Sequence, residues 1–335
     1  MLLLNLLTRA APYGYPETDE TRRLAALWEK HVGPVPIDDY GDFEDFFEQA
    51  VRLDAAVKSV SLPGIWLTIN GSKEAKNLES GETQPAENFK NSPHYGLLST
   101  QDFLFHSSPD AVRDAQVDKY WQWDTFQRFA GREVISTGFG SSIQGKDLMN
   151  EIFTLYKTGV ERFFIKETKT KAGIWVIELT ENLSYEEVYK IVDVELEWSL
   201  VRNEDREDCF LVQPHTSMRN EYRFFVVDNT LVTGAGCVEE FTPLNNQAQF
   251  DAQMREHRNW NHEPITSQLE LLGKYRKFAE NVVRHLKEEK PEIGSYVLDV
   301  ARSISGEPMI VEFNSLLNSG LYASQPARVV AALVE

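Results

Sequence analysis

Hydrophobic residues in the N-terminal third of the chain follow helical and then extended patterns. Residues Thr18–His31 have apolar positions at helical spacing and acidic residues in the first turn, which is typical of an amphipathic helix. Residues Asp42–Lys58 repeat that spacing, whereas Gly64–Asn70 has the pattern of a short buried strand. The polar residues of Gly71–Pro93 predict a long loop or insertion, and Phe103–His106 is a short apolar run.

Beyond Asn150 the chain alternates between β-rich runs and amphipathic helices. Helices are predicted at Leu183–Val201, Ile265–Glu289 and Pro326–Val334. Strands are predicted at Arg162–Lys166, Gly173–Leu179, Cys209–Gln213, Glu221–Val227, Leu231–Val238, Ser295–Ala301 and Met309–Phe313. Tight turns at Asp228-Asn229 and Ser305-Gly306 join two pairs of these strands. Intermixed strands and helices predict an α+β fold.

Four aromatic residues lie close together between these two regions. They are Trp121, Trp123, Phe126 and Phe129, at mixed spacing. Such clusters belong more often to a hydrophobic core than to a base-stacking surface, so we favour a core. We expect a domain boundary near this point, with an N-terminal domain at 1–138 and a C-terminal domain at 139–335.

Composition restricts the class of protein. The chain has 335 residues, 42% of them hydrophobic, which favours two or three packed units over a single core. Its 34 basic and 52 acidic residues give a net charge of −18, which argues against general coating of nucleic acid. A small, locally basic cleft remains compatible with this charge, and so does a basic protein partner.

Cysteine usage and hydropathy predict a cytoplasmic protein. Cys209 and Cys237 lie in no CxxC pair, and we expect two buried free thiols in a reducing compartment. The apolar run Met1–Leu7 is too short for a membrane span and lacks the basic residues of a signal peptide, so it predicts a buried first strand.

The strongest chemical signal is a pair of C-terminal strands that carry carboxylates. Asp299 interrupts one apolar strand, and Glu312 and Asn314 lie two residues apart on the next. Alternation puts Glu312 and Asn314 on one face, and pairing of the strands across Gly306 brings Asp299 towards them. Two carboxylates and an amide oxygen suit Mg²⁺. The alternative is a structural network in which Arg or backbone donors hold the carboxylates.

A second signal is a basic strand end followed by a loop. Lys166 ends the run Phe163–Ile165, and a strand end is a position from which a lysine can reach a phosphate. The loop Glu167–Gly173 is rich in Lys and Thr and could fold over phosphates, although it has a single glycine. A solvated hairpin with a basic tip is the alternative interpretation.

A third signal is Arg223, which lies between Tyr222 and Phe224 in an apolar strand. A buried arginine needs an anion partner. That partner could be Glu312, Asp299 or a triphosphate, since a planar guanidinium suits phosphate oxygens. The residues alone leave this choice open.

The order of these motifs resembles the ATP-grasp superfamily, in which two α+β subdomains bind ATP between them. The segments EYRFFVVDNTLV and IVEFNSLLNSGLY are similar to the clade named for two active-site arginines and one lysine. The resemblance covers roughly 162–322 and implies an ATP-grasp fold preceded by an α/β pre-grasp domain.

The resemblance also implies roles for individual residues. Lys166 would contact the phosphates or adenine of ATP, and Lys171 would cover the phosphates. Main chain at Leu211, Val212 and Gln213 would hold the adenine edge. Arg223 would stabilise the transferring phosphoryl group, while Mg²⁺ would be held by Asp299, Glu312 and Asn314. The second arginine stays open between Arg219, Arg202 and Arg302.

Three functions are compatible with this resemblance. The first is an ATP- and Mg²⁺-dependent ligase that activates a carboxylate for attack by an amine or other nucleophile, with an unknown small-molecule, peptide or RNA-end acceptor. The second is RNA end-joining or repair, which predicts a basic strip of Lys119, Arg128, Arg132 and Lys146. The third is a non-catalytic ATP-binding assembly chaperone.

Overall fold

The computed structural model describes residues 2–6, 19–31, 56–59, 61, 64–69, 74–89, 94–96, 117, 119–168, 173–238, 248–257, 263–316 and 319–334. The chain divides into two compact units. The main unit consists of Met1–Asp118, Arg219–Arg302 and Val311–Glu335, and the inserted unit consists of Lys119–Met218 and Ser303–Ile310. We describe each unit by itself.

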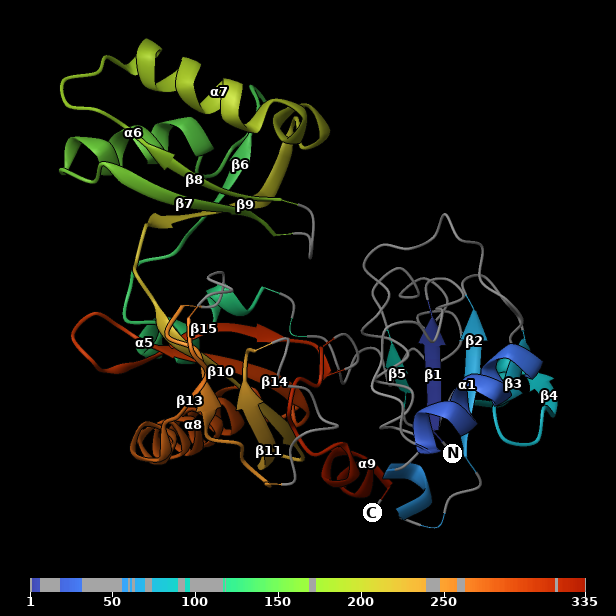
Figure 1. Cartoon of the computed structure of the whole chain (residues 1–335). Coiled ribbons are helices and arrows are strands. Elements are labelled where there is room, and N and C mark those ends of the chain that lie inside the picture. Colours follow the sequence, from blue (N-terminus) through green and yellow to red (C-terminus); the bar gives the residue numbers. More distant parts are fainter. Residues whose placement is uncertain are drawn as a thin grey trace. The chain divides into compact units, whose positions relative to one another are not determined.

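The N-terminal part of the main unit contains a five-stranded sheet in the order β4-β3-β2-β1-β5 (Figure 1). Strand β1 (Leu2–Leu6) pairs in parallel with β2 (Ile65–Ile69) and with β5 (His94–Gly96). Helix α1 spans Asp19–His31. These elements confirm the predicted first strand, first helix and second strand. Residues 56–59 are helical, as predicted, whereas the earlier part of that helix and the run Phe103–His106 lie outside the described residues.

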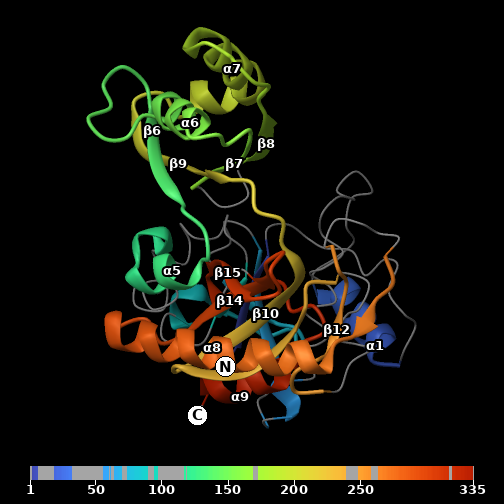
Figure 2. The ribbon, with the colours of Figure 1, turned by 90° about the vertical axis from the view of Figure 1, so that its left-hand side faces the viewer.

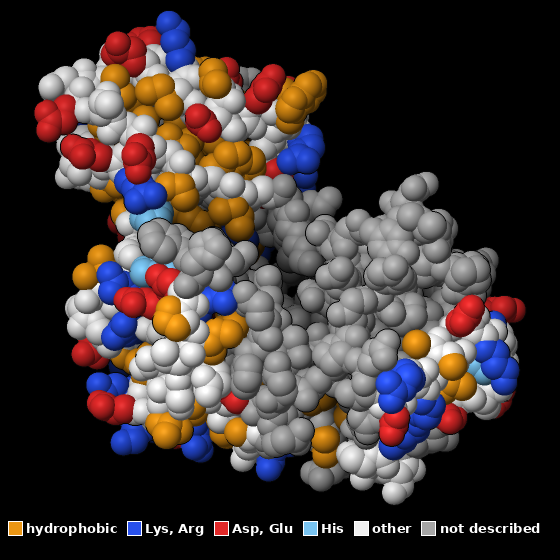
Figure 3. All heavy atoms as spheres, viewed as in Figure 1, with side chains coloured by type: hydrophobic (Ala, Val, Ile, Leu, Met, Phe, Trp, Pro, Cys, Tyr) orange, Lys and Arg blue, Asp and Glu red, His pale blue; other side chains and the backbone are white. Residues whose placement is uncertain are grey.

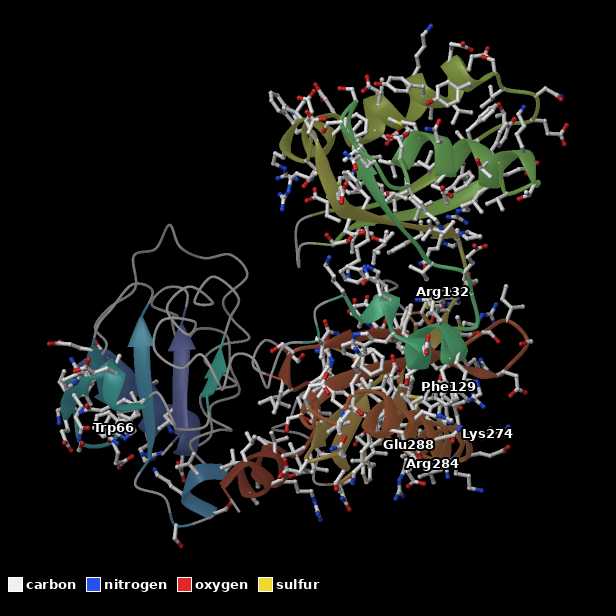
Figure 4. All side chains as sticks on the ribbon, turned by 180° about the vertical axis from the view of Figure 1, so that it is seen from behind. Trp66, Phe129, Arg132, Lys274, Arg284 and Glu288 are labelled. Atoms are coloured by element: carbon white, nitrogen blue, oxygen red, sulfur yellow. The ribbon has the colours of Figure 1, made fainter. Side chains whose placement is uncertain are left out.

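The predicted long loop at Gly71–Pro93 is wrong over residues 74–89. Strand β3 (Glu74–Asn77) pairs antiparallel with β2, and β4 (Thr83–Pro85) pairs antiparallel with β3. A 3₁₀ turn, η2 (Ala86–Phe89), follows. Phe89 is buried, with its ring centroid 5.0 Å from that of Trp66, which Figure 4 labels. The polar composition misled the prediction because β3 buries only the small Ala75 and the polar Asn77, and β4 is a three-residue edge strand with no buried side chain.

The inserted unit is an antiparallel sheet in the order β6-β9-β7-β8, with two helices on one face (Figure 1). The strands are β6 (Ile135–Phe139), β7 (Arg162–Glu167), β8 (Ile174–Glu178) and β9 (Arg206–Pro214). Helix α6 (Leu148–Lys157) begins at Asp147, whose side chain accepts from two backbone N–H groups. Helix α7 (Tyr185–Arg202) begins with a capping box of Ser184 and Glu187. Both helices bury their apolar faces against one side of the sheet.

The short elements η4 (Tyr120–Gln122) and α5 (Asp124–Phe129) precede this sheet in the chain. Trp121, Trp123 and Phe126 are buried there, which confirms that they belong to a core. On the surface of the inserted unit, Figure 3 shows acidic side chains spread among hydrophobic ones, as the acidic composition suggests.

The C-terminal part of the main unit is an antiparallel sheet in the order β11-β10-β14-β15. Its strands are β10 (Arg219–Val227), β11 (Thr230–Gly236), β14 (Tyr296–Arg302) and β15 (Pro308–Asn314). Asp228 and Asn229 have φ of 48° and 57°, as a tight hairpin turn requires, and Gly306 has φ of 90°. All four strands and both turns were predicted.

Helix α8 (Leu269–Glu289) crosses one side of this sheet, as Figure 2 shows, and buries Tyr275, Ala279 and Val282. It begins four residues later than predicted, because β13 (Thr266–Ser267) pairs with β12 (Gln253–Met254) before the helix starts. Helix α9 (Pro326–Val334) has the predicted bounds and packs against β11. The antiparallel sheets and their helices confirm the α+β class. No helix in the described ranges is long and apolar enough to cross a membrane.

Candidate functional site

The three predicted metal ligands come together on the C-terminal sheet of the main unit. Asn314 Nδ2 donates to Asp299 Oδ2 at 2.9 Å and to Glu312 Oε1 at 3.1 Å. The side chains therefore share one face of β14 and β15, as alternation predicted. Glu312 and Asn314 are half-buried, whereas Asp299 is completely buried.

Arg223 on β10 completes this cluster. It lies directly opposite Asp299 on β14. Its Nε donates to Asp299 Oδ1 at 2.8 Å and its Nη2 to Asp299 Oδ2 at 2.7 Å, which is the bidentate fork geometry. Nη1 donates to the carbonyl of Gly320 at 3.1 Å, and the ring of Tyr322 lies 4.9 Å from Cζ. Among the partners that the sequence left open, the structure pairs Arg223 with Asp299.

The charges of this cluster are tightly coupled. Arg223 has 6% of its surface exposed, and although burial alone would lower its pKa, the adjacent Asp299 raises the pKa well above its usual value. The guanidinium is thus a permanent cation in a fixed orientation. The guanidinium thus lies between the buried carboxylate of Asp299 and the ring of Tyr322, while Glu312 is linked to the pair through Asn314.

The residue types of the cluster, rather than its hydrogen bonds, suit Mg²⁺, because Asn314 turns its Nδ2 towards both carboxylates and both oxygens of Asp299 accept from Arg223. Carboxylate and amide oxygens are the ligands this ion prefers, and it commonly takes only one or two carboxylates from the protein and keeps several waters. Within the part of the chain that the structure describes, no group of three His, Cys, Asp or Glu side chains could hold a metal. A site here would therefore depend on the amide of Asn314 as well as on Glu312 and Asp299.

The three candidates for a second arginine are each paired with a carboxylate outside this cluster. Arg202 Nη2 donates to Glu167 at 2.7 Å. Arg219 Nη1 donates to Glu256 at 2.5 Å, and Arg302 Nη2 lies 3.8 Å from the same oxygen. The contacts of the described residues therefore place Arg223 alone of these arginines beside Asp299.

Of the other predicted residues, Lys166, Leu211 and Gln213 lie on the face of the inserted unit's sheet opposite to α6 and α7, whereas Val212 lies on the face that the helices cover. Lys166 on β7 lies directly opposite Leu211 on β9 and Ile174 on β8. Opposite residues of paired strands share a face. The intervening Ile165 and Val212 point into the core beneath the helices. Lys166 thus shares this face of the sheet with Leu211, which is buried, and with Ile174, which is exposed.

The main chain at Leu211, Val212 and Gln213 is hydrogen-bonded within the sheet. Strand β9 pairs with β7 at all three residues and with β6 at Leu211 and Val212. The side chain of Gln213 is also engaged, since its Oε1 accepts from Arg132 Nε at 2.8 Å. Leu211 and Gln213 are both buried, with 6% of their surface exposed, so Lys166 is the most accessible of the predicted residues on this face.

Sequence reasoning missed one group beside this strand, Glu167, and named Arg132 only as part of a basic strip. Glu167, adjacent to Lys166, is buried and accepts from Ser199 and from Arg202. Arg132, which Figure 4 labels, also donates to the carbonyls of Ala130 at 2.9 Å and Ile310 at 2.5 Å. A buried carboxylate at the end of an apolar strand was the available signal for Glu167. Lys171 lies outside the described residues.

Both cysteines are free and buried, as predicted. Burial raises the pKa of the Cys209 thiol to about 11. The thiol is therefore protonated at neutral pH, and Cys209 is a structural residue rather than a nucleophile.

Comparison with known proteins relates this site to a family of domains. The family model that matches is the ATP-grasp domain, family 2 of the clade named for two arginines and one lysine, and it covers residues 129–332, more than half of the chain. A search of the curated proteins found no match. Among solved structures, D-cycloserine synthetase DcsG matches with a TM-score of 0.53 at 11% identity, over 99% of this chain and 98% of that one. This likeness bears on the fold.

Two further structures match with lower scores. D-alanyl-alanine synthetase A from Vibrio cholerae has a TM-score of 0.49 at 8% identity, over 99% of this chain and 93% of that one. Macrocyclase MdnC from Microcystis aeruginosa, bound with precursor peptide MdnA, has a TM-score of 0.48 at 9% identity, over the full length of both chains.

Proposed function

Because the chain belongs to family 2 of this clade of ATP-grasp domains, a fold family of ATP- and Mg²⁺-dependent ligases, we propose that it activates a carboxylate as an acyl phosphate, which an amine or another nucleophile then attacks. The observation that carries this proposal is the hydrogen-bonded cluster of Arg223, Asp299, Glu312 and Asn314 on three adjacent strands. Its parts are those that phosphoryl transfer requires: a preorganised cation and an oxygen-rich site for a metal.

In this proposal Glu312 and Asn314 hold Mg²⁺ together with Asp299. When bound, the ion would neutralise charge on the transferring phosphoryl group. Asp299 has a second role, because its bidentate contact fixes the orientation of Arg223. A guanidinium held in place before the reaction stabilises developing negative charge without the cost of reorganisation.

The inserted unit supplies the nucleotide contacts of the proposal. Lys166 provides a positive charge for phosphate oxygens, and Leu211 provides an apolar surface for the adenine ring. Val212 and Gln213 contribute by positioning the strand, while Lys171 covers the phosphates. The enzyme acts in the cytoplasm, where its two buried thiols stay reduced.

Neither alternative function gains support from a specific contact. Lys119, from the basic strip expected of an RNA-joining enzyme, forms an ion pair with Asp208 at 3.0 Å. Arg132 is directed towards Gln213 and two backbone carbonyls. These two cations therefore have structural partners, and the acceptor is better sought among amines, amino acids and peptides.

The test is calorimetric titration of ATP with and without Mg²⁺, on wild type and on Glu312→Gln. We expect Mg²⁺-dependent binding that weakens by about tenfold or more in the variant, since a carboxylate ligand contributes at least ~1.4 kcal/mol. The matched control is Glu307→Gln, an exposed carboxylate on the turn between β14 and β15. Equal binding by wild type and Glu312→Gln would remove the metal site from this cluster. Release of ADP and phosphate with pools of amines and carboxylates would then identify the acceptor.

A further inference from the structure

A β-bulge in β10 brings two arginines face to face. The register between β10 and β14 pairs Tyr222 with Val300 but Arg219 with Arg302, so β10 has one residue more than β14 over this stretch. The stretch includes Asn220, which lies in the left-handed region with φ of 53°. Bulges re-aim side chains and are frequent near functional sites. Like charges directly opposite one another are destabilising, so this arrangement calls for an explanation.

The arginine pair lies on the side of the sheet that α8 covers. Arg302 is two residues beyond Val300, and alternation puts both on the same face as Tyr222. Tyr222 packs towards Tyr275 of α8, with ring centroids 6.2 Å apart. The hydroxyl of Tyr275 donates to the carbonyl of Asn220 at 3.0 Å. The cluster of Arg223 and Asp299 occupies the opposite face, so the two sets of residues are separate.

The two guanidinium groups have few acceptors. Glu256 Oε1 lies 2.5 Å from Arg219 Nη1 and 3.8 Å from Arg302 Nη2, and the longer distance is not a hydrogen bond. The Nε atoms of both arginines are buried and lack a hydrogen-bond partner among the described residues. Their side chains are nevertheless 39% and 36% exposed, so solvent reaches the pair.

The surrounding backbone holds Glu256 in place. The N–H of Asn220 donates to the carbonyl of Glu256 at 2.7 Å, and its side-chain amide donates to the carbonyl of Arg255 at 3.3 Å. The residue that forms the bulge therefore also holds the backbone of Glu256, whose carboxylate both arginines approach. Each guanidinium has five N–H donors, and a single carboxylate oxygen cannot satisfy both.

We propose that Arg219 and Arg302 form an anion site for a phosphate group, either free phosphate or a phosphomonoester. A phosphate has the charge and the number of acceptor oxygens to engage both planar forks, which a single carboxylate lacks. The bound anion would join the first residue of β10 to the last residue of β14. The site is independent of the nucleotide chemistry proposed above, because its residues lie on the other face of the sheet.

The test is equilibrium dialysis of labelled inorganic phosphate at constant ionic strength, with Mg²⁺ and a non-hydrolysable ATP analogue present in excess. We expect wild type to bind phosphate, and Arg219→Gln and Arg302→Gln to lose about tenfold or more in affinity, since each removes a charge-assisted interaction. The matched control, Arg284→Gln, removes an exposed arginine of α8 that Figure 4 labels, and it should bind like wild type. A parallel titration with glycerol phosphate distinguishes the source, since tighter binding of the ester would indicate an esterified ligand.

Three results would overturn the site: no binding by wild type, equal binding by wild type and Arg302→Gln, or an equal loss in Arg284→Gln. If the glutamine variants do not fold, Arg302→Lys gives the answer. This variant keeps the positive charge but loses the planar guanidinium, so it should bind phosphate more weakly than wild type but still measurably. Unchanged affinity in Arg302→Lys, together with equal affinity in Arg219→Lys, would show that general electrostatic attraction accounts for the binding.

Discussion

Replacing Asp299 by Asn tests how much the buried ion pair of Asp299 and Arg223 contributes to the free energy of unfolding. Asp299 has no exposed surface, and the side chain of Arg223 is 8% exposed. Removing one partner of a buried pair leaves an uncompensated charge and typically costs about 3–5 kcal/mol. The remaining contacts of Arg223, with the carbonyl of Gly320 and the ring of Tyr322, offset part of that cost. We therefore expect a loss near the lower end, about 3 kcal/mol of unfolding free energy.

The assay combines urea unfolding with hydrogen exchange of peptides from β10 and β14. Hydrogen exchange is needed because a protein of two units need not unfold in one transition. Glu312→Gln serves as the comparison, since Glu312 is half-buried and accepts from the neutral amide of Asn314. Its expected loss is about 1 kcal/mol. The double variant Arg223→Met/Asp299→Leu should recover much of the stability lost in Asp299→Asn, because no charge is left unpaired.

Two results would refute this reasoning. A loss below about 1 kcal/mol in Asp299→Asn would mean that the pair contributes little, contrary to its burial. A double variant as unstable as the single one would mean that packing, rather than unpaired charge, accounts for the effect. If Asp299 acts only as a metal ligand, Asp299→Asn should weaken Mg²⁺ binding and leave the apo stability near that of wild type.

Two further predictions concern pH and glycine. Burial lowers the pKa of His215, so the folded state takes up fewer protons than the unfolded state once the pH falls below about 6.5. The free energy of unfolding should therefore decrease on acidification. Tm measured against pH should fall less steeply in His215→Asn than in wild type. A Cβ at Gly273 of α8 would meet nothing within 4 Å, so Gly273→Ala should raise the free energy of unfolding by about 0.5–1 kcal/mol. A Cβ at Gly234 would lie 2.7 Å from the carbonyl oxygen of Arg223, so Gly234→Ala should lower the free energy of unfolding by about 1–3 kcal/mol. If urea unfolding found Gly234→Ala more stable than Gly273→Ala, that result would contradict the packing described.

Periodicity was informative wherever one face of an element is buried against a neighbour. The bounds of α9 were predicted to the residue, and β14 and β15 within one residue, because their apolar positions recur regularly. Alternation also placed Glu312 and Asn314 on one face, and the hydrogen bonds of Asn314 confirm it. Helix α6 was missed, although Asp147 and the apolar positions that follow carry the signal of a capped helix.

Features that depend on contacts between distant segments could not be read from the sequence. The partner of Arg223 was left open because the choice depends on the register of β10 against β14. Side-chain alternation could not predict that Arg219 lies opposite Arg302, because the bulge at Asn220 reverses the alternation of a regular strand. Strands β3 and β4 escaped prediction because they are short and join the sheet through backbone pairing, with β3 between β2 and β4 and with β4 at the edge.

The distance along the chain between Arg223 and Asp299, 76 residues, determines when the candidate site can exist during folding. The hairpin of β10 and β11 closes across the two-residue turn at Asp228-Asn229, so it can form early from local contacts. Arg223 remains without its buried counter-ion until β14 docks, after the entropic cost of closing the long intervening segment has been met. We therefore expect the cluster to form late in folding, and a chain that stops before Asn314 to lack it even where the hairpin and α8 are present.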